Sequence, residues 1–417
     1  MATDQSEGKG RYVDFPPLPA DAKNEDGSPR LNRYSATITS GHDFPAAQAM
    51  LYAAGVPDEQ AMKNSPQVGI GSVWWEGNPC NMHLLDLAKT VKKAIIDKGM
   101  IGWQYNTIGV SDAISMGMRF SLQTREIIAD SIETVTCAQH HDACITIPGC
   151  DKNMPGCIMA MARHNRPSLM IYGGTIKSGY SKTLRKPINI STCLEAAGAF
   201  AYGTLGKSKD GKEPDSTASP DEIMKDLERH ACPGAGACAG MYTANTLSTA
   251  IESMGLTLPG SSSTPAESPA KMRECVKAAE AIRTCMEKNI RPRDLLTKES
   301  FENALVMTMA LGGSTNACLH LIAMANTAEV ELNIDDFQRV SNKIPFLANL
   351  APSGKYYMAD LYEIGETNTL SMDVSDEEIE SRMKEWKAPK PQVTRGVLAK
   401  YAKLVGDASH GALTDLF

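Results

Sequence analysis

Three reactive side chains stand next to one another at Cys150, Asp151 and Lys152. Glycine and proline flank them on both sides, in the stretch Ile-Pro-Gly-Cys-Asp-Lys-Asn-Met-Pro-Gly over residues 147–156. A thiol, a carboxylate and an amine are costly to bury without partners, so their adjacency indicates a binding or catalytic turn. The alternative is a buried structural cysteine beside a surface Asp–Lys pair, and these ten residues alone leave it open.

The residues around this turn predict the elements that position it. The apolar run over 142–148 is typical of a buried strand. Pro155 suits the first turn of a helix, because a proline there gives up an N–H that would lack a partner anyway. A strand, a glycine-containing turn and a helix, in that order, form the place where open α/β sheets bind their ligands.

Cys80 and Cys238 each lie in a turn just before a predicted helix, as Cys150 does. Cys80 precedes a helical pattern over 84–95, and Cys238 lies in the small-residue turn at 231–245 that opens another helix. A helix N-terminus favours the thiolate, which is the form that binds iron. Three thiolates from three such turns can converge at one end of a parallel sheet. Three cysteine ligands suit an iron–sulfur cluster with one iron open to substrate.

Zinc is the competing metal for a group of cysteines. The chain contains no C-x-x-C and no H-x₃-H pattern, so a closed structural zinc site has weak support. Cys232 stays open as a ligand because it lies six residues before Cys238. The remaining cysteines fall in helix or strand patterns and are predicted to be core, namely Cys137, Cys144, Cys157, Cys193, Cys275, Cys285 and Cys318.

Asp112, Asp151 and Lys152 form a second group. Asp112 ends a strand predicted over 104–112. Two carboxylates near a lysine make an incomplete site for a hard cation, and Mg²⁺ prefers oxygen ligands with some waters retained. An unmodified ammonium cannot ligate a cation, whereas a carbamylated lysine can.

Other polar motifs carry weaker predictions. The stretch 234–240 has the spacing G-x-G-x-x-x-G without a preceding strand, so a dinucleotide fingerprint is rejected. His140 and His141, at a predicted helix end, are as easily a structural cap as ligands. His83 and His320 are predicted to be core residues or supporting groups. The stretch 312–316, Gly-Gly-Ser-Thr-Asn, is a candidate anion site at a helix N-terminus.

The whole chain limits the classes of protein to consider. Its 417 residues predict two or three domains. A net charge of −7 without a basic stripe argues against nucleic acid. No apolar run approaches the ~20 residues of a membrane-spanning helix. Eleven cysteines, an odd number, do not suggest a secreted disulfide framework, so a reducing compartment is expected.

Strands that alternate with helices predict an α/β fold with a helix-covered, mostly parallel sheet. We expect an N-terminal arm over 1–40, a cluster- and metal-binding domain over 41–365 and a different, charged segment over 366–417. The first residues lack a signal-peptide core and an Arg-rich presequence. The protein is therefore expected to be cytosolic or to have lost a transit peptide.

The chain resembles the dihydroxy-acid dehydratases, whose superfamily also includes sugar-acid and 6-phosphogluconate dehydratases. The resemblance runs in order from about residue 30 to residue 365. The matching segments are Pro79-Cys-Asn-Met-His83, Val110-Ser-Asp112-Ala-Ile-Ser-Met-Gly117, Ser121-Leu-Gln-Thr-Arg-Glu-Ile-Ile-Ala-Asp130, Pro148-Gly-Cys-Asp-Lys-Asn-Met-Pro155, Gly236-Ala-Cys-Ala-Gly-Met-Tyr-Thr-Ala-Asn245 and Leu311-Gly-Gly-Ser-Thr-Asn316.

The resemblance implies roles for both groups of residues. Cys80, Cys150 and Cys238 would hold a [2Fe–2S] cluster, with [4Fe–4S] as the alternative. The Mg²⁺ ligands would be Asp112, Asp151 and a carbamylated Lys152.

The implied reaction is the removal of water from 2,3-dihydroxy-3-methyl acids, of the 2,3-dihydroxyisovalerate type, to give 2-keto acids in branched-chain amino-acid biosynthesis. A sugar-acid (aldonate) dehydratase is the alternative. A homodimer is expected from the family, in the mitochondrial matrix if the source is eukaryotic and otherwise in the cytoplasm.

The chain departs from this family near its C-terminus. Family members carry a second, β-rich, barrel-like domain with a Phe-Ser-Gly-Gly segment, whose serine is the expected base, and a further Mg-binding glutamate. Here the segment 351–365 matches the end of the first domain, and the segments 368–378 and 386–389 resemble the family's extreme C-terminus. Phe-Ser-Gly-Gly does not occur. We therefore expect most of the second domain to be missing, and a non-catalytic cluster-binding subunit is a further alternative.

Overall fold

A parallel four-stranded sheet forms the centre of the computed structural model, which describes residues 17–24, 26–115, 118–207 and 217–367. The strand order is β2-β1-β3-β4, and every neighbouring pair is parallel. The strands are β1 (Gln67–Ser72), β2 (Ile101–Asn106), β3 (Ala143–Ile147) and β4 (Ser168–Met170). The predicted helix-covered, mostly parallel α/β sheet is confirmed.

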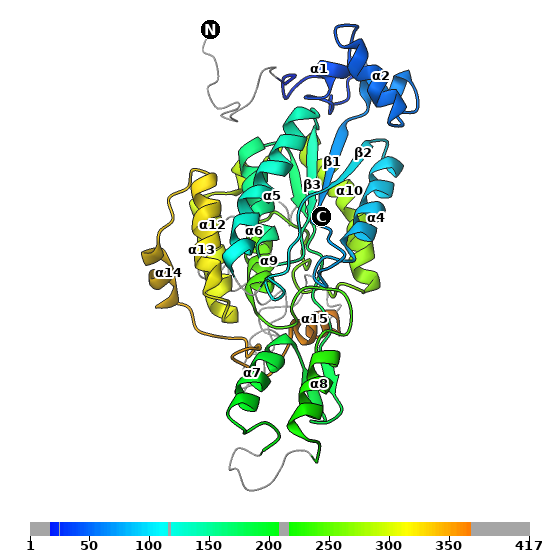
Figure 1. Ribbon diagram of the computed structural model, residues 1–417. Helices are drawn as coiled ribbons and strands as arrows, with labels where there is room; N and C mark the ends of the chain where they lie inside the picture. The colour runs from blue at the N-terminus through cyan, green and yellow to red at the C-terminus, as the bar shows by residue number, and fades with distance from the viewer. Residues whose placement is uncertain (1–16, 25, 116–117, 208–216, 368–417) are drawn as a thin grey trace.

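The central strands β1 and β3 are buried along their whole length. Such strands are apolar on both sides because helices cover both faces of a parallel sheet. One face carries α4 (Leu84–Asp97) and α10 (Pro269–Glu287), which pack against each other. The opposite side carries five helices (Figure 1), namely α5 (Met118–Ala138), α6 (Asn153–His164), α9 (Thr243–Ser253), α12 (Lys298–Leu311) and α13 (Asn316–Thr327).

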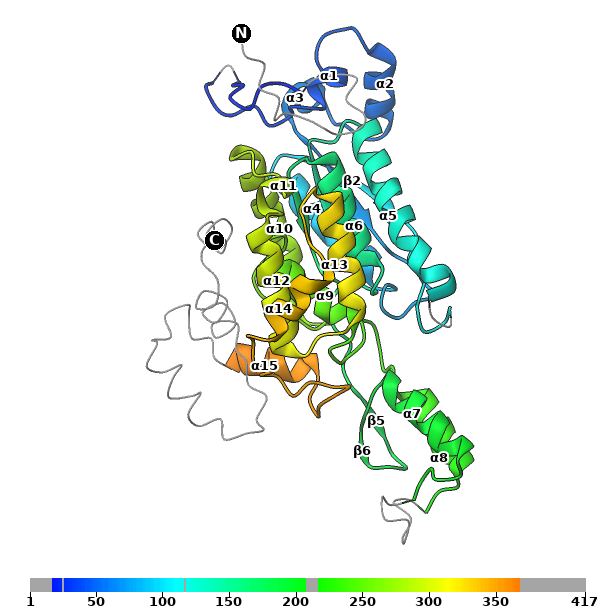
Figure 2. The same ribbon diagram turned by 90° about the vertical axis from the view of Figure 1, so that its left-hand side faces the viewer.

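Smaller elements lie at the two ends of the sheet. Three short helices lie beyond the amino edge, at the top of Figure 1, namely α1 (Ala36–Thr39), α2 (Pro45–Ala53) and α3 (Glu59–Asn64). A lobe projects beyond the carboxyl edge (Figure 2) and contains β5 (Gly179–Ser181), β6 (Lys186–Ile188), α7 (Ile190–Ala201) and α8 (Pro220–His230). The remaining short helices are α11 (Pro292–Leu295), α14 (Ile334–Ser341) and α15 (Met358–Thr367).

The lobe has a small core of its own. β5 and β6 form an antiparallel hairpin, and Ile188 of β6 and Ile223 and Leu227 of α8 are fully buried. Within the described residues, this hairpin and the central sheet are the two sheets, and no barrel accompanies them. None of the described helices has the length and apolar character needed to cross a membrane.

Local predictions from the sequence agree with the structure where the periodicity was clear. The helix after Cys80 ends at Asp97, ahead of Gly99, which has a φ of +76°. One predicted strand differs in extent. The strand predicted over 104–112 is β2, which begins at Ile101 and ends at Asn106. The segment predicted as a separate unit over 366–417 lies outside the described residues beyond Thr367.

Candidate metal centre at the carboxyl edge of the sheet

The three predicted cysteines come together at the carboxyl edge of the sheet. Cys80 follows β1, Cys150 follows β3 and Cys238 precedes α9. The Cys80 thiol forms side-chain hydrogen bonds with both Cys150 and Cys238. All three thiols are free, so none is used in a disulfide. The fold therefore gathers three sulfur atoms from segments far apart in sequence.

Backbone pairing brings the Cys238 turn to the sheet. The Ala237 N–H donates to the carbonyl of Gly174 at 2.9 Å, and the Ile176 N–H donates to the carbonyl of Ala237 at 2.7 Å. Gly236 has a φ of +129°, and a Cβ there would lie 2.5 Å from the backbone nitrogen of Ile176. Only glycine allows this approach. The glycines of 234–240, which do not form a dinucleotide fingerprint, thus serve close packing of two backbones.

The thiols differ in their readiness to ionise. Hydrogen bonds with Cys150 and Cys238, followed by burial, raise the pKa of Cys80 well above its usual range. The hydrogen bond from Cys80 lowers the pKa of Cys150 to about 7, against the opposing effect of burial. A cysteine whose pKa is near 7 is partly thiolate at neutral pH, and the thiolate is the metal-binding form. The trio is therefore suited to hold a soft metal.

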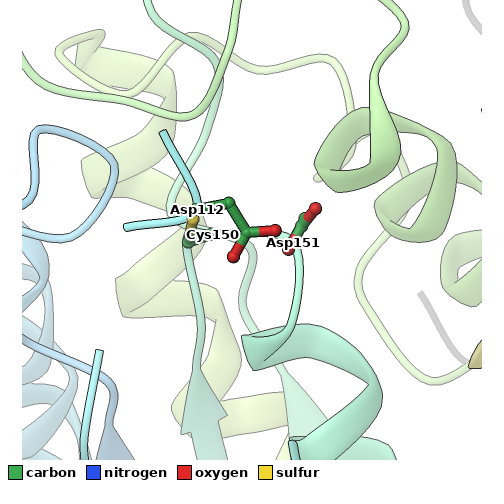
Figure 3. A group of neighbouring side chains, drawn as sticks. All are labelled: Asp112, Cys150 and Asp151. Carbon is green, nitrogen blue, oxygen red and sulfur yellow. The ribbon is translucent and has the colours of Figure 1, made fainter. Parts of the chain in front are cut away.

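Two carboxylates and an amine lie beside the thiols. The Lys152 Nζ is 2.5 Å from the Asp112 Oδ2 and 2.9 Å from the Asp151 Oδ1. One ligand atom each from Asp112, Cys150 and Asp151 lies within 4.8 Å of the other two. Figure 3 shows the Asp112 carboxylate pointing toward that of Asp151, with Cys150 next to Asp112. Three residues from two loops thus present sulfur and oxygen to one small volume.

Two carboxyl groups share the single ammonium of Lys152, and the Oδ1 of Asp112 is buried with no hydrogen-bond partner among the described residues. Burial, and then the hydrogen bond with Asp112, raise the pKa of Asp151 to about 8, so this carboxyl group keeps a proton at neutral pH. Burial opposes the positive charge of Lys152, but the Asp151 and Asp112 carboxylates raise its pKa nonetheless. A carboxyl proton that a cation can displace and a free acceptor oxygen are what a cation site provides before the cation binds.

Residues at the start of α9 and α13 complete this edge. The Asn316 Nδ2 lies 3.4 Å from the Asp151 Oδ2 and 3.1 Å from the Thr243 Oγ1. The predicted anion site at 312–316 therefore lies beside Asp151, at the start of α13. The available signal was its small-residue turn before a helix, which is the context of all three cysteines.

The histidines are supporting groups or lie elsewhere. The His83 Nε2 is 2.7 Å from the carbonyl of Gly173, next to the thiol group. His320 is fully buried, and burial, followed by the charge of Lys152, lowers its pKa to about 3. His141 lies beside Gly69 of β1, away from the carboxyl edge, and His140 follows the end of α5 with a φ of +53°. Cys232 is exposed and does not share the hydrogen bonds of the thiol trio.

The residues present fit both a soft and a hard metal. Three neighbouring thiols, in which Cys80 bonds to both of the others and Cys150 has a lowered pKa, suit iron. A buried carboxylate oxygen without a partner suits a hard cation. Fold and site together define the class of protein. It is an α/β protein in which a group of thiols and a group of carboxylates lie next to each other at the carboxyl edge of a parallel sheet.

Comparison with known families agrees with this class. The sequence model of the family described as dihydroxy-acid/6-phosphogluconate dehydratase, N-terminal, matches residues 65–385. The chain belongs to this family.

Curated relatives from three groups of organisms are similar over the same part of the chain. A protein of Schizosaccharomyces pombe named dihydroxy-acid dehydratase, mitochondrial, is 54% identical over 340 residues, which are 81% of this chain and 54% of that protein. The Arabidopsis thaliana protein named dihydroxy-acid dehydratase, chloroplastic, is 52% identical over 81% of this chain and 53% of its own length. The dihydroxy-acid dehydratase of Francisella tularensis subsp. novicida is 52% identical over 81% of this chain and 58% of its own length. The chain spans about half the length of these relatives.

Proposed function

We propose that the chain carries the cluster- and metal-binding domain of a dihydroxy-acid dehydratase. This hydro-lyase would remove water from 2,3-dihydroxy-3-methyl acids to give 2-keto acids in branched-chain amino-acid biosynthesis. The observation that supports the proposal most strongly is the turn at 150–152, which contributes to the thiol trio and to the carboxylate pair at once. The printed names of the relatives support the substrate class.

Cys80, Cys150 and Cys238 would hold an iron–sulfur cluster, of the [2Fe–2S] type with [4Fe–4S] as the alternative. Three thiols are one fewer than the four cysteines that usually hold such clusters, so one iron position would be left to a ligand from outside the protein. A structural zinc site would need a fourth protein ligand, and the exposed Cys232 stands apart from the trio's hydrogen bonds.

Asp112, Asp151 and a carbamylated Lys152 would hold Mg²⁺. Carbamylation joins the Lys152 Nζ to the carbon of CO₂ and releases two protons from the ammonium group, so that a cation becomes an anion with oxygen ligands. The two carboxylates would then lose the ammonium that now lies 2.5 and 2.9 Å from them. Because three buried anions repel one another, the modification and the binding of a cation would be linked.

When bound, the cluster and Mg²⁺ would supply Lewis-acid chemistry for the leaving hydroxyl and for the carboxylate and 2-hydroxyl of the substrate. The turn at 150–152 would contribute ligands to both. Asn316 steadies the Asp151 carboxylate through its amide. The C2 proton must still be removed. The serine expected from the family lies in a Phe-Ser-Gly-Gly segment that this sequence lacks, so no catalytic base is assigned here.

The cell compartment and assembly follow from the relatives only as proposals. Fungal relatives named mitochondrial favour the mitochondrial matrix for a eukaryotic source, and bacterial relatives favour the cytoplasm. A homodimer is proposed, which size-exclusion chromatography with light scattering would test.

The test of the proposal is to prepare the chain without oxygen and to measure iron, sulfide and magnesium per chain. EPR and Mössbauer spectra would distinguish the cluster types. Turnover would be followed as 2-keto acid formed from 2,3-dihydroxyisovalerate, with an aldonate as the competing substrate. Absence of iron and sulfide would overturn the proposed cluster, and a preference for the aldonate would favour the sugar-acid alternative. Bound cluster without turnover would favour a non-catalytic subunit.

A further inference from the structure

Each of the three cysteines is hydrogen-bonded through its backbone to a buried asparagine. The N–H of Cys80 donates to the Asn78 Oδ1 at 3.1 Å, and the N–H of Cys150 donates to the Asn153 Oδ1 at 2.8 Å. The Asn245 Nδ2 donates to the carbonyl of Cys238 at 2.5 Å. The asparagines at 78, 153 and 245 are all 0% exposed. Burying an amide is unfavourable unless it is paired, so three such residues at three cysteines indicate a common purpose.

The loops that carry Cys80 and Cys150 are also bound to each other. The Asn81 Nδ2 donates to the Asn153 Oδ1 at 2.9 Å and to the carbonyl of Val73 at 2.7 Å. A Cβ at Gly149 would lie 2.2 Å from the carbonyl oxygen of Cys80, so the two backbones approach as closely as glycine permits. The position of one thiol is therefore fixed relative to the other through Asn153.

The Cys238 loop is fixed in a different way. The Asn245 Nδ2 also donates to the carbonyl of Gly240 at 2.6 Å, and its Oδ1 accepts from the Tyr172 hydroxyl at 2.7 Å. Tyr172 is fully buried and follows β4 in the chain. An amide whose oxygen and nitrogen are both paired has one orientation, so Tyr172 connects the Cys238 loop to the sheet.

We propose that three residues are positioning residues, which set the spacing of the three thiols before iron binds. These are Asn153, for the loops of Cys80 and Cys150, and Asn245 with Tyr172, for the loop of Cys238. The inference rests on the proposed function in that these cysteines receive an iron–sulfur group. Partners behind a metal ligand orient it, and their loss typically weakens metal binding by about 10- to 100-fold. A site whose thiols are already held in place loses less conformational freedom when the metal binds.

The two asparagines act with opposite polarity, which provides a sharp test. Asn153 is used as an acceptor, a role that an aspartate keeps. Asn245 is used as a donor to two carbonyls, and an aspartate loses that role. N153D and N245D each add the same acidic group at a fully buried position next to a cysteine loop. N32D is the matched control, because Asn32 is also buried and donates to a carbonyl, that of Lys63, in the N-terminal region.

The experiment uses the full chain and these variants, reconstituted anaerobically with iron and sulfide. Iron per chain and the rate at which a chelator bleaches the visible absorbance are measured. Binding of Co²⁺ to the iron-free proteins is followed by the thiolate-to-cobalt absorption band. We expect N245D to weaken metal binding by about 10- to 100-fold, with a smaller effect for N153D and none for N32D. Tyr172→Phe, which removes one hydroxyl and keeps the ring, should speed cluster loss several-fold and change the visible circular dichroism.

Equal Co²⁺ affinities for wild type, N153D and N245D, all folded by far-ultraviolet circular dichroism, would overturn the positioning role whatever iron the wild type binds. An N153D effect as large as that of N245D would overturn it too. If the wild type takes up no iron and the Co²⁺ affinities still fall in the expected order, the positioning role holds and the iron–sulfur part of the proposed function fails. If N245D does not fold, the Tyr172→Phe result decides.

Discussion

Carboxyl groups lie at both edges of the sheet, buried at the amino edge and partly buried at the carboxyl edge, and they differ in how they are hydrogen-bonded. At the amino edge, Asp142 accepts hydrogen bonds from the N–H groups of Tyr34, Ser35 and Gln67 and from the Ser35 hydroxyl, at 2.6 to 2.9 Å. At the carboxyl edge, Asp112 and Asp151 share one ammonium, and one Asp112 oxygen has no partner among the described residues. A fully paired carboxylate holds a structure together, whereas an underpaired one indicates a site that binds something.

Burial raises the pKa of carboxyl groups at both edges of the sheet. It raises the pKa of Asp142 to about 6 although several donors lower it, and it raises that of Asp151 to about 8, where Asp112 adds to the effect. Hydrogen bonds therefore offset only part of the cost of burying a charge. The amino edge uses its carboxylate to attach the N-terminal segment to β1 and β3.

Replacing cysteines gives the largest expected contrast between the site and the core. Cys150→Ala should lose nearly all bound iron because it removes the thiol that bonds to Cys80. Cys157→Ala is the matched control, since Cys157 is fully buried in α6 and burial raises its pKa. It should keep its iron and lose about 1 kcal/mol of unfolding free energy. Iron analysis and chemical denaturation measure the two effects, and equal iron loss would refute the separation.

Asp142→Ala should affect stability and leave the metal centre alone. Four donors would lose their acceptor, so the free energy of unfolding should fall by about 3 to 4 kcal/mol. Urea denaturation of the metal-free protein measures it. Asp86→Ala is the control, because Asp86 is exposed and paired only with Lys89, and it should change stability by less than about 0.5 kcal/mol. A loss below about 1 kcal/mol for Asp142→Ala would show that the carboxylate does not hold this edge together.

Comparing wild type with Asp142→Asn across pH isolates the titration of Asp142. Its pKa of about 6 in the folded protein lies above the ordinary 3.8, so the folded state binds this proton more tightly. The stability that Asp142 contributes is thus fully present below about pH 4 and falls until about pH 6. Burial lowers the pKa of His141 and His164 to about 3, which gives the opposite slope.

Both histidines are present in the two proteins, so their contributions cancel in the difference. The unfolding free energy of wild type relative to the variant should fall by on the order of 2 to 3 kcal/mol between pH 4 and 6. A difference that does not change with pH would contradict the assignment.

Asp112→Asn should have the smallest effect on stability. Asparagine can still accept a hydrogen bond from Lys152, and Asp151, whose raised pKa falls without the Asp112 charge, can pair with the ammonium, so stability should shift by about 1 kcal/mol or less. The stabilisation that added Mg²⁺ gives the wild type in a thermal melt should disappear. An unchanged response to Mg²⁺ would remove Asp112 from the proposed site.

The features of this site that depend on neighbouring residues in the chain could be predicted from the sequence. The contacts between distant segments could not. A thiol in a small-residue turn before a helix is a local pattern, and for that reason Cys80, Cys150 and Cys238 could be predicted, as could the parallel sheet. Asp112, which was also predicted for the site, lies beyond β2 and not at its end. The adjacency of Asp151 and Lys152 is visible in the sequence itself.

The supporting contacts could not be predicted because their partners are far apart. Tyr172 meets Asn245 across 73 positions, and Asn316 meets Asp151 across 165. Neither contact produces a pattern in the sequence of the two segments that it joins. Asn153 and Asn245 were visible within motifs, but an asparagine beside a cysteine is also common in exposed turns. Its role depends on burial, which a single sequence does not give.

The pairing of the Cys238 turn with residues 174–176 has a consequence for how the protein is made. A chain leaves the ribosome with its N-terminus first. The hydrogen bond between Asn81 and Asn153 joins two loops that have both been synthesised once β4 has emerged. The third thiol arrives only after the whole lobe of α7 and α8 has been synthesised. A group that needs all three thiols can therefore bind only after the chain has been made as far as Cys238.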